Sequence, residues 1–113
     1  MDKTLVTRST GMLLLKLIES EDMYGYQMIE MLRERSEHSF DLKAGTLYPL
    51  LHSLEEKELI RSYEKDEGAA RPRRYYHLER KGQHLLREKE VEWATFTTAV
   101  DRVLKGGVCL GSA

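Results

Sequence analysis

The clearest hydropathy pattern in the chain is a set of leucines spaced i, i+3, i+4 and i+7: Leu47, Leu50, Leu51 and Leu54. This spacing predicts a helix over about residues 44–57 that buries one face. The opposite face carries Thr46, Tyr48 and His52, and Lys43 stands just before the helix. A short helix with a packed back and a hydrogen-bonding front suits insertion into a DNA major groove, and it equally suits an ordinary surface helix.

The same kind of pattern predicts the elements on either side: helices over about residues 9–20, 24–36 and 79–104, and strands over 59–64 and 71–78 joined by a turn at 65–70. The first helix is apolar around most of its circumference, which indicates burial on several sides or a place in a subunit interface. Gly25 would permit a close approach between helices, and Gly82 should weaken the last helix slightly. Pro49 predicts an irregular first turn of its helix rather than a break.

Three helices, a hairpin and a long final helix follow one another in the order of a winged helix-turn-helix. The sequence therefore predicts a mainly α (α+β) fold with a two-stranded β-wing and a long C-terminal dimerisation helix. We expect residues 1–78 to form a DNA-binding domain, 79–105 the dimerisation helix and 106–113 a Gly-rich, flexible tail.

The composition is that of a globular, helix-rich chain, with 113 residues of which 41% are hydrophobic and 33% charged. The single cysteine, Cys109, excludes an intrachain disulfide and a multi-cysteine metal site, and this usage fits a reducing cytoplasm. The longest apolar run, residues 12–18, is too short to span a bilayer, and we expect no signal peptide. A net charge of -1 and a pI near 6.4 argue weakly against a nucleic-acid partner, although local basic clusters can still supply positive charge.

Three arginines lead the second predicted strand with no acidic residue among them: Arg71, Arg73 and Arg74. Arginines at a hairpin tip can neutralise phosphates or enter a minor groove, although runs of charge are more often simply solvated. Their place after a candidate recognition helix favours DNA binding. Tyr48 either covers the helix edge or donates to a phosphate, Thr46 either does the same or caps the helix, and His52 either reads a base edge or is merely exposed. The competing function is a winged-helix protein–protein interaction module that never binds DNA.

The last predicted helix carries an apolar seam with heptad spacing: Leu86, Trp93, Phe96, Val100, Val103 and Leu104. A domain this small cannot bury such a seam alone, so we expect the seam to pair with a second copy, to pack on the first helix of its own subunit, or both. A dimer would place two recognition helices about 34 Å apart and predicts a palindromic operator. The seam is interrupted at Lys89 and Glu90, which leaves room beside it.

The sequence offers little catalytic chemistry. Cys109 lies in the Gly-rich tail with no group nearby that would lower its pKa. The histidines are scattered, with no two at metal-ligand spacing on one clear helix face: His38, His52, His77 and His84. We therefore expect no enzymatic activity, no cofactor and no metal site.

Three motifs together resemble the PadR-like transcriptional regulators: Gly25-Tyr26; Gly45-Thr46-Leu47-Tyr48-Pro49 with Leu51 and Leu54; and Arg73-Arg74-Tyr75-Tyr76 followed by Gly82. Each motif alone is weak, but the combination is specific and covers about residues 10–104. Glu58 stands where many relatives have glycine, and Glu79 where a threonine often opens the last helix. These departures concern local turn geometry.

The resemblance implies a dimeric repressor of the short subclass, whose third helix enters the major groove and whose wing lies along the DNA backbone. Carried over by position, the recognition-helix contacts are Lys43, Thr46 and Tyr48, and the wing contacts are Arg71, Arg73 and Arg74. In some PadR-like multidrug sensors a tryptophan at a similar place stacks against flat aromatic drugs at the dimer centre. By this resemblance Trp93, with Phe96 beside it, is the candidate site for a planar aromatic effector, and the alternative role is that of an interface anchor.

Overall fold

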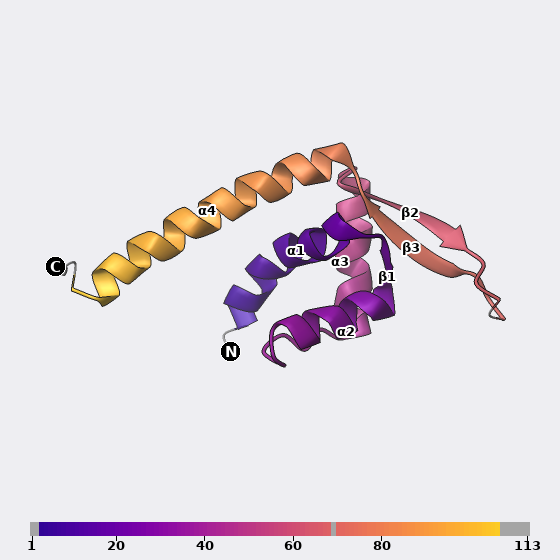
Figure 1. Ribbon diagram of the computed structural model, residues 1–113, viewed down its shortest axis with the longest axis horizontal. Coiled ribbons are helices and arrows are strands. Elements are labelled where there is room, and N and C mark those ends of the chain that lie inside the picture. The colour runs from indigo at the N-terminus through magenta and orange to yellow at the C-terminus, as the bar shows by residue number, and fades with distance from the viewer. Residues whose placement is uncertain (1–2, 69, 107–113) are drawn as a thin grey trace.

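The computed structural model describes residues 3–68 and 70–106 (Figure 1). Along this part of the chain the elements are α1 (Lys3–Ser20), β1 (Met23–Tyr24), α2 (Gly25–Arg35), α3 (Ala44–Glu56), β2 (Ile60–Lys65), β3 (Arg73–Leu78) and α4 (Arg80–Leu104). The helices predicted from periodicity are all present, and the first one starts six residues earlier than residue 9, the predicted beginning. Cys109 and most of the predicted tail lie outside the described residues.

The core lies where α1, α2 and α3 meet the sheet. Four apolar side chains of α1 are at most 3% exposed: Leu14, Leu15, Leu17 and Ile18. Three elements, α2, α4 and β3, pack against this part of the helix, whereas Lys16 stays exposed. The predicted burial of this helix on several sides is therefore confirmed.

The predicted two-stranded wing is present as β2 and β3, and a third strand that was not predicted, β1, extends the antiparallel sheet in the order β1-β3-β2. The third strand, β1, is only two residues long, and its Met23 pairs with Tyr76 and is fully buried. A strand of two residues is too short to produce an alternating pattern, so the sequence carried no signal for it. The strand β3 begins at Arg73 rather than at the predicted position 71, and Pro72, which has no backbone N–H, stands just before it.

Alternation along β2 and β3 gives the sheet two different faces, because successive side chains point to opposite sides of a strand. One face turns toward α3 and the core, and it carries the buried Ile60 and Tyr76. The other face carries Tyr63 and Tyr75, whose rings stack with centroids 5.9 Å apart. Consecutive residues of the wing therefore lie in different surroundings.

The helix α3 packs on the core through Leu47, Leu51 and Leu54, as predicted, while Leu50 is only partly buried. It continues unbroken through Pro49. The proline ring leaves the carbonyl of residue 45 without its helical donor, close to the helix start, where few helical bonds have yet formed. The prediction that Pro49 does not break the helix is confirmed.

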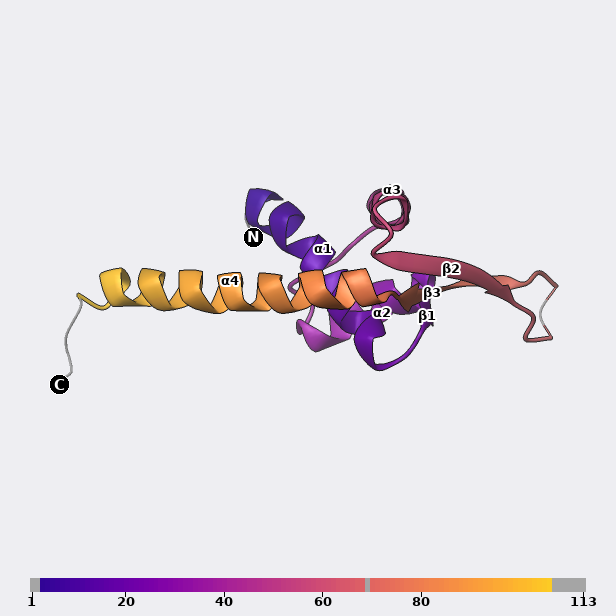
Figure 2. The ribbon, with the colours of Figure 1, turned by 90° about the horizontal axis from the view of Figure 1, so that it is seen from above.

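The helix α4 is long and extends away from the rest of the fold (Figures 1 and 2). The described chain consequently measures 60 × 28 × 22 Å. Only the first turns of α4 join the core, where Leu86 is fully buried. This corrects the assignment of Leu86 to a dimer seam, because a side chain enclosed by its own protomer cannot contact a second copy.

Gly82 has a different role from the one predicted. A Cβ added there would collide with the Leu59 carbonyl oxygen and would lie 2.7 Å from Leu78 Cδ1. The glycine therefore lets α4 pass close to the start of β2, a structural requirement rather than a mere weakness of the helix. Among the described residues no helix is both long and apolar enough to cross a membrane.

Candidate nucleic-acid interface

The helix α3 presents the polar face that its leucine pattern implies. Lys43, Thr46 and His52 are exposed, and Tyr48 is 46% exposed. Figure 2 shows α3 on one side of α4 and the sheet. Lys43 forms an exposed ion pair with Asp41 at 3.0 Å, and His52 Nε2 lies 3.6 Å from Glu56 Oε2.

Tyr48 is less free than its exposure suggests, because its ring lies over Gly25 at the start of α2. A Cβ added at Gly25 would lie 2.5 Å from the Tyr48 hydroxyl oxygen and 2.8 Å from Cζ. The close approach predicted at Gly25 is therefore confirmed, with an aromatic side chain as the group that approaches. The α2 backbone thus holds the phenol at the edge of α3.

The wing arginines differ from one another. Arg73 lies on the tyrosine face, with its guanidinium carbon 4.5 Å from the centroid of the Tyr24 ring, and pairs with Glu67 at 3.7 Å. Arg74 lies on the face toward α3 and donates from Nη1 to Ser62 Oγ at 3.1 Å. Arg71 is exposed and precedes the strand.

Acidic partners of these arginines come from across the hairpin. Glu64 is paired with Arg74 in the strand register, with an ion pair of 3.7 Å, and Glu67 reaches back from the loop to Arg73 and to the Tyr75 hydroxyl at 2.5 Å. The hydrogen bond to Glu67 raises the pKa of Tyr75. Neither partner was predicted from the sequence. The strand pairing of the hairpin would indicate Glu64 as a partner of Arg74, whereas no local sequence pattern indicates Glu67 as a partner of Arg73.

Two further side-chain groups connect the wing to the body. Glu55 of α3 accepts from the backbone N–H and the hydroxyl of Ser62 in β2, at 3.0 and 2.7 Å. Asp22, between α1 and β1, accepts from the Tyr63 hydroxyl at 2.5 Å and contacts His77 Nδ1 at 2.9 Å. Burial opposes ionisation of Asp22, but these hydrogen bonds outweigh it and lower the pKa of the carboxyl group.

A network of four charges fastens α4 to α1. Lys16 contacts Glu19 and Glu90, both at 3.0 Å. Arg87 contacts Glu19, and it also contacts Glu90, at a distance of 2.8 Å. The side-chain hydrogen bonds from Lys16 and Arg87 lower the pKa values of Glu19 and Glu90. Glu90, which interrupts the apolar seam, thus connects the two helices.

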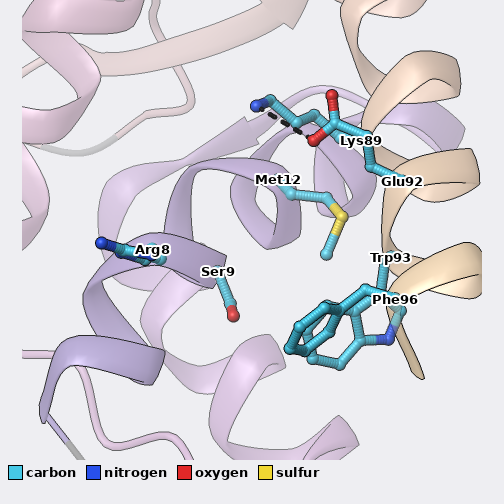
Figure 3. A pocket seen from close by; sticks show the side chains of 7 residues that line it. All are labelled: Arg8, Ser9, Met12, Lys89, Glu92, Trp93 and Phe96. Carbon is cyan, nitrogen blue, oxygen red and sulfur yellow. Dashed lines mark ion pairs between the residues drawn. The ribbon is translucent and has the colours of Figure 1, made fainter. Parts of the chain in front are cut away.

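A cavity of about 460 Å³ lies between α1 and α4, next to this network (Figure 3). Its lining consists of Arg8, Ser9, Met12, Lys89, Glu92, Trp93 and Phe96. Figure 3 shows Ser9 and Met12 directed from α1 toward Trp93 and Phe96, whose ring centroids are 6.2 Å apart. The structure therefore brings the two predicted effector residues together at an open cavity.

The outer part of α4 keeps its apolar side chains exposed. Val103 is 79% and Leu104 is 76% exposed, Trp93 and Phe96 are also exposed, and Val100 is half-buried. Within one chain, α1 does not cover the end of this seam. The described residues contain no group of three or more histidine, cysteine or acidic side chains that could hold a metal ion.

Comparison with known proteins places this arrangement in a family. A model of the transcriptional regulator PadR-like family matches residues 14–88. The chain belongs to the PadR-like family. A PadR family transcription regulator from hypervirulent Clostridium difficile is 34% identical, with a TM-score of 0.77 and coverage of 85% of this chain and 98% of that chain. A protein of unknown role from Lysinibacillus sphaericus is 34% identical over 94 residues, which make up 83% of this chain and 86% of its relative.

The PadR-like fold also extends to a protein solved on DNA. Bacillus subtilis PadR in complex with operator DNA has a TM-score of 0.68 and 20% identity, and the match covers 74% of this chain and 46% of that one. At this identity the likeness concerns the fold, and it confirms the winged-helix architecture. The family match includes α3 and the wing and ends before the exposed seam of α4.

Proposed function

We propose that this PadR-like protein is a homodimeric repressor that binds palindromic operator DNA and is released by a small molecule. The observation that carries the proposal is that two exposed groups lie on the same side of the sheet. They are α3, with its exposed polar residues, and Arg74 of the wing. A relative of the same fold, Bacillus subtilis PadR, was solved with operator DNA. This supports the same class of partner here.

The proposed DNA contacts divide by chemistry. Phosphate contacts come from Lys43, Thr46 and Tyr48 on α3 and from Arg71, Arg73 and Arg74 in the wing, while His52 faces the groove. Exposed ion pairs such as Arg74–Glu64 contribute about 0–1 kcal/mol, so phosphates can compete for these arginines. Tyr48, held against Gly25, is a pre-positioned phosphate donor rather than a base reader.

The test is operator binding by wing variants, with a duplex selected from random DNA as the probe. Replacing Arg73 and Arg74 together by alanine should abolish binding and spare dimerisation. Each phosphate contact contributes about 0.9 to the logarithmic salt slope, so one substitution, present twice in a dimer, should lower that slope by about 2. The matched control is Arg102→Ala in the exposed last turn of α4, far from the wing. Normal DNA binding by the double variant would contradict the proposal.

The proposed dimer pairs the exposed seam of α4, made of Trp93, Phe96, Val100, Val103 and Leu104, with a second copy. Apolar area removed from water stabilises association by roughly 25 cal/mol per Å². Sedimentation equilibrium should therefore give a dimer, and Val103→Glu should weaken it, because a charge would enter the interface. A wild-type chain that remains monomeric at micromolar concentration would contradict this assembly.

The proposed effector is a planar aromatic molecule in the cavity beside Trp93 and Phe96. Trp93 is the single tryptophan of the chain, so its fluorescence reports on this cavity alone. Stacking of a flat ring should quench it, and the same compound should release the operator duplex. Unchanged fluorescence across a broad panel of planar compounds would eliminate this role.

The second candidate function is a winged-helix module that binds another protein. The acidic pI near 6.4 favours it. Salt discriminates the two functions, because binding to DNA through several arginines weakens steeply as salt rises.

A further inference from the structure

The wing of this protein is connected to α3 by a chain of directed hydrogen bonds. Glu55, in the last turn of α3, accepts through Oε2 from both the backbone N–H and the hydroxyl of Ser62. The Ser62 oxygen in turn accepts from Arg74 Nη1 at 3.1 Å. We propose that Ser62 and Glu55 are positioning residues that fix Arg74 relative to α3, so that operator affinity depends on them although neither contacts DNA. This inference rests on the proposed function.

The direction of these bonds is determined by the chemistry of the hydroxyl group. A serine hydroxyl has one proton and two acceptor lone pairs. The carboxylate of Glu55, 2.7 Å away, can only accept, so the proton points toward α3. The lone pairs then face Arg74, and the charged groups at both ends strengthen each bond. Ser62 thus fixes Arg74 relative to the carboxylate of Glu55.

The position of Ser62 in the sheet explains why α3 can reach it. The strand β2 lies at the edge of the sheet, and Figure 2 shows it as the strand next to α3. An edge strand leaves some backbone N–H groups without a partner in the sheet. Glu55 satisfies one of these groups, that of Ser62, at 3.0 Å. The helix α3 therefore contacts the backbone of β2 as well as the chain of side-chain hydrogen bonds from Glu55 through Ser62 to Arg74, which we call the relay.

Arg74 keeps donors available for a phosphate. A guanidinium has five N–H donors, and the contacts with Ser62 and Glu64 use only part of them. The Arg74 side chain is 56% exposed, whereas the Glu55–Ser62 bonds are partly buried. The relay therefore has a sheltered end at α3 and an open end at the wing. Within the part of the chain that the structure describes, the ion pair that Arg74 keeps without the relay is the one with the exposed carboxylate of Glu64.

The experiment measures operator affinity of the full chain by fluorescence anisotropy, with a duplex selected from random DNA. Ser62→Ala removes the relay but keeps the backbone bond to Glu55, and it should weaken binding by about 3- to 10-fold. Ser62→Thr restores a hydroxyl in a residue that strands accept, and it should bind like wild type. Urea unfolding of each variant verifies that the fold is unchanged.

A double-mutant cycle separates positioning from a general structural role. If Ser62 acts through Arg74, then Ser62→Ala combined with Arg74→Ala should bind no more weakly than Arg74→Ala alone. Additive losses, or a Ser62→Ala variant that binds like wild type while Arg74→Ala is weakened, would overturn the inference and leave the proposed function intact. An Arg74→Ala variant that binds like wild type would overturn the wing contact and the relay together. Absence of DNA binding by the wild type would overturn the proposed function itself.

Discussion

Gly82 is the position where the smallest chemical change should disturb this fold the most. An added methyl group would collide with the Leu59 carbonyl oxygen, which is backbone and cannot rotate aside, and would lie 2.7 Å from Leu78 Cδ1. The same carbonyl oxygen accepts the Glu79 N–H at 3.0 Å, just before α4 begins. Gly82→Ala must therefore push the start of α4 away from β2 and stretch that bond.

The expected change in the free energy of unfolding follows from two destabilising effects and one stabilising effect. Overpacking in a buried site costs about 1–3 kcal/mol, and loss of one hydrogen bond costs about 1 kcal/mol. Alanine stabilises a helix interior by about 1 kcal/mol relative to glycine. The net result is a loss of roughly 1–3 kcal/mol in the free energy of unfolding.

Urea unfolding followed by far-ultraviolet circular dichroism, at one fixed protein concentration, measures this loss. The midpoint for Gly82→Ala should fall by roughly 0.5–2 M with little change in slope. Gly45→Ala in α3 is the matched control, because a Cβ there meets nothing within 4 Å, and it should leave stability unchanged or raise it by up to about 1 kcal/mol. If both variants were as stable as wild type, the contact between α4 and Leu59 would not require a glycine.

Two more predictions concern the groups around the sheet. Gly25→Ala should displace the Tyr48 ring, since the added Cβ would lie 2.5 Å from its hydroxyl oxygen, and should weaken operator binding while changing the unfolding free energy by less than about 1 kcal/mol; unchanged affinity would mean that the phenol is not a DNA contact. Hydrogen bonds from Tyr63 and His77 outweigh burial and lower the pKa of Asp22 below its ordinary 3.8, so its contribution to stability is present above about pH 4 and is lost as pH falls through the lowered pKa. Asp22→Asn should therefore reduce the dependence of the unfolding free energy on acidic pH, and an identical dependence in both proteins would refute this coupling.

The candidate site could be predicted from the sequence only in part. Leucine periodicity located α3, and with it the exposed face that carries Thr46 and His52. The run of arginines located the wing but did not distinguish the surroundings of Arg73 from those of Arg74. In the structure the first stacks on Tyr24 and the second joins Ser62, because neighbouring strand residues point to opposite faces.

Leu86 illustrates the limit of the heptad pattern. Its spacing matches that of Trp93, seven residues later, but Leu86 is buried in the core and Trp93 is exposed at the cavity. A heptad indicates which residues share a face of a helix, and it does not indicate what that face contacts along its length. The surroundings of this helix face change where α4 extends beyond the rest of the domain.

By itself the sequence determined the helices, the hairpin and the family resemblance, because hydropathy periods and turn residues act over a few neighbouring positions. Only the tertiary structure decided which charges and rings meet. Asp22 joins His77 across 55 positions, Arg87 joins Glu19 across 68, and β1 exists only because β3 lies beside it. Such contacts depend on how the elements pack, and no local pattern records the packing.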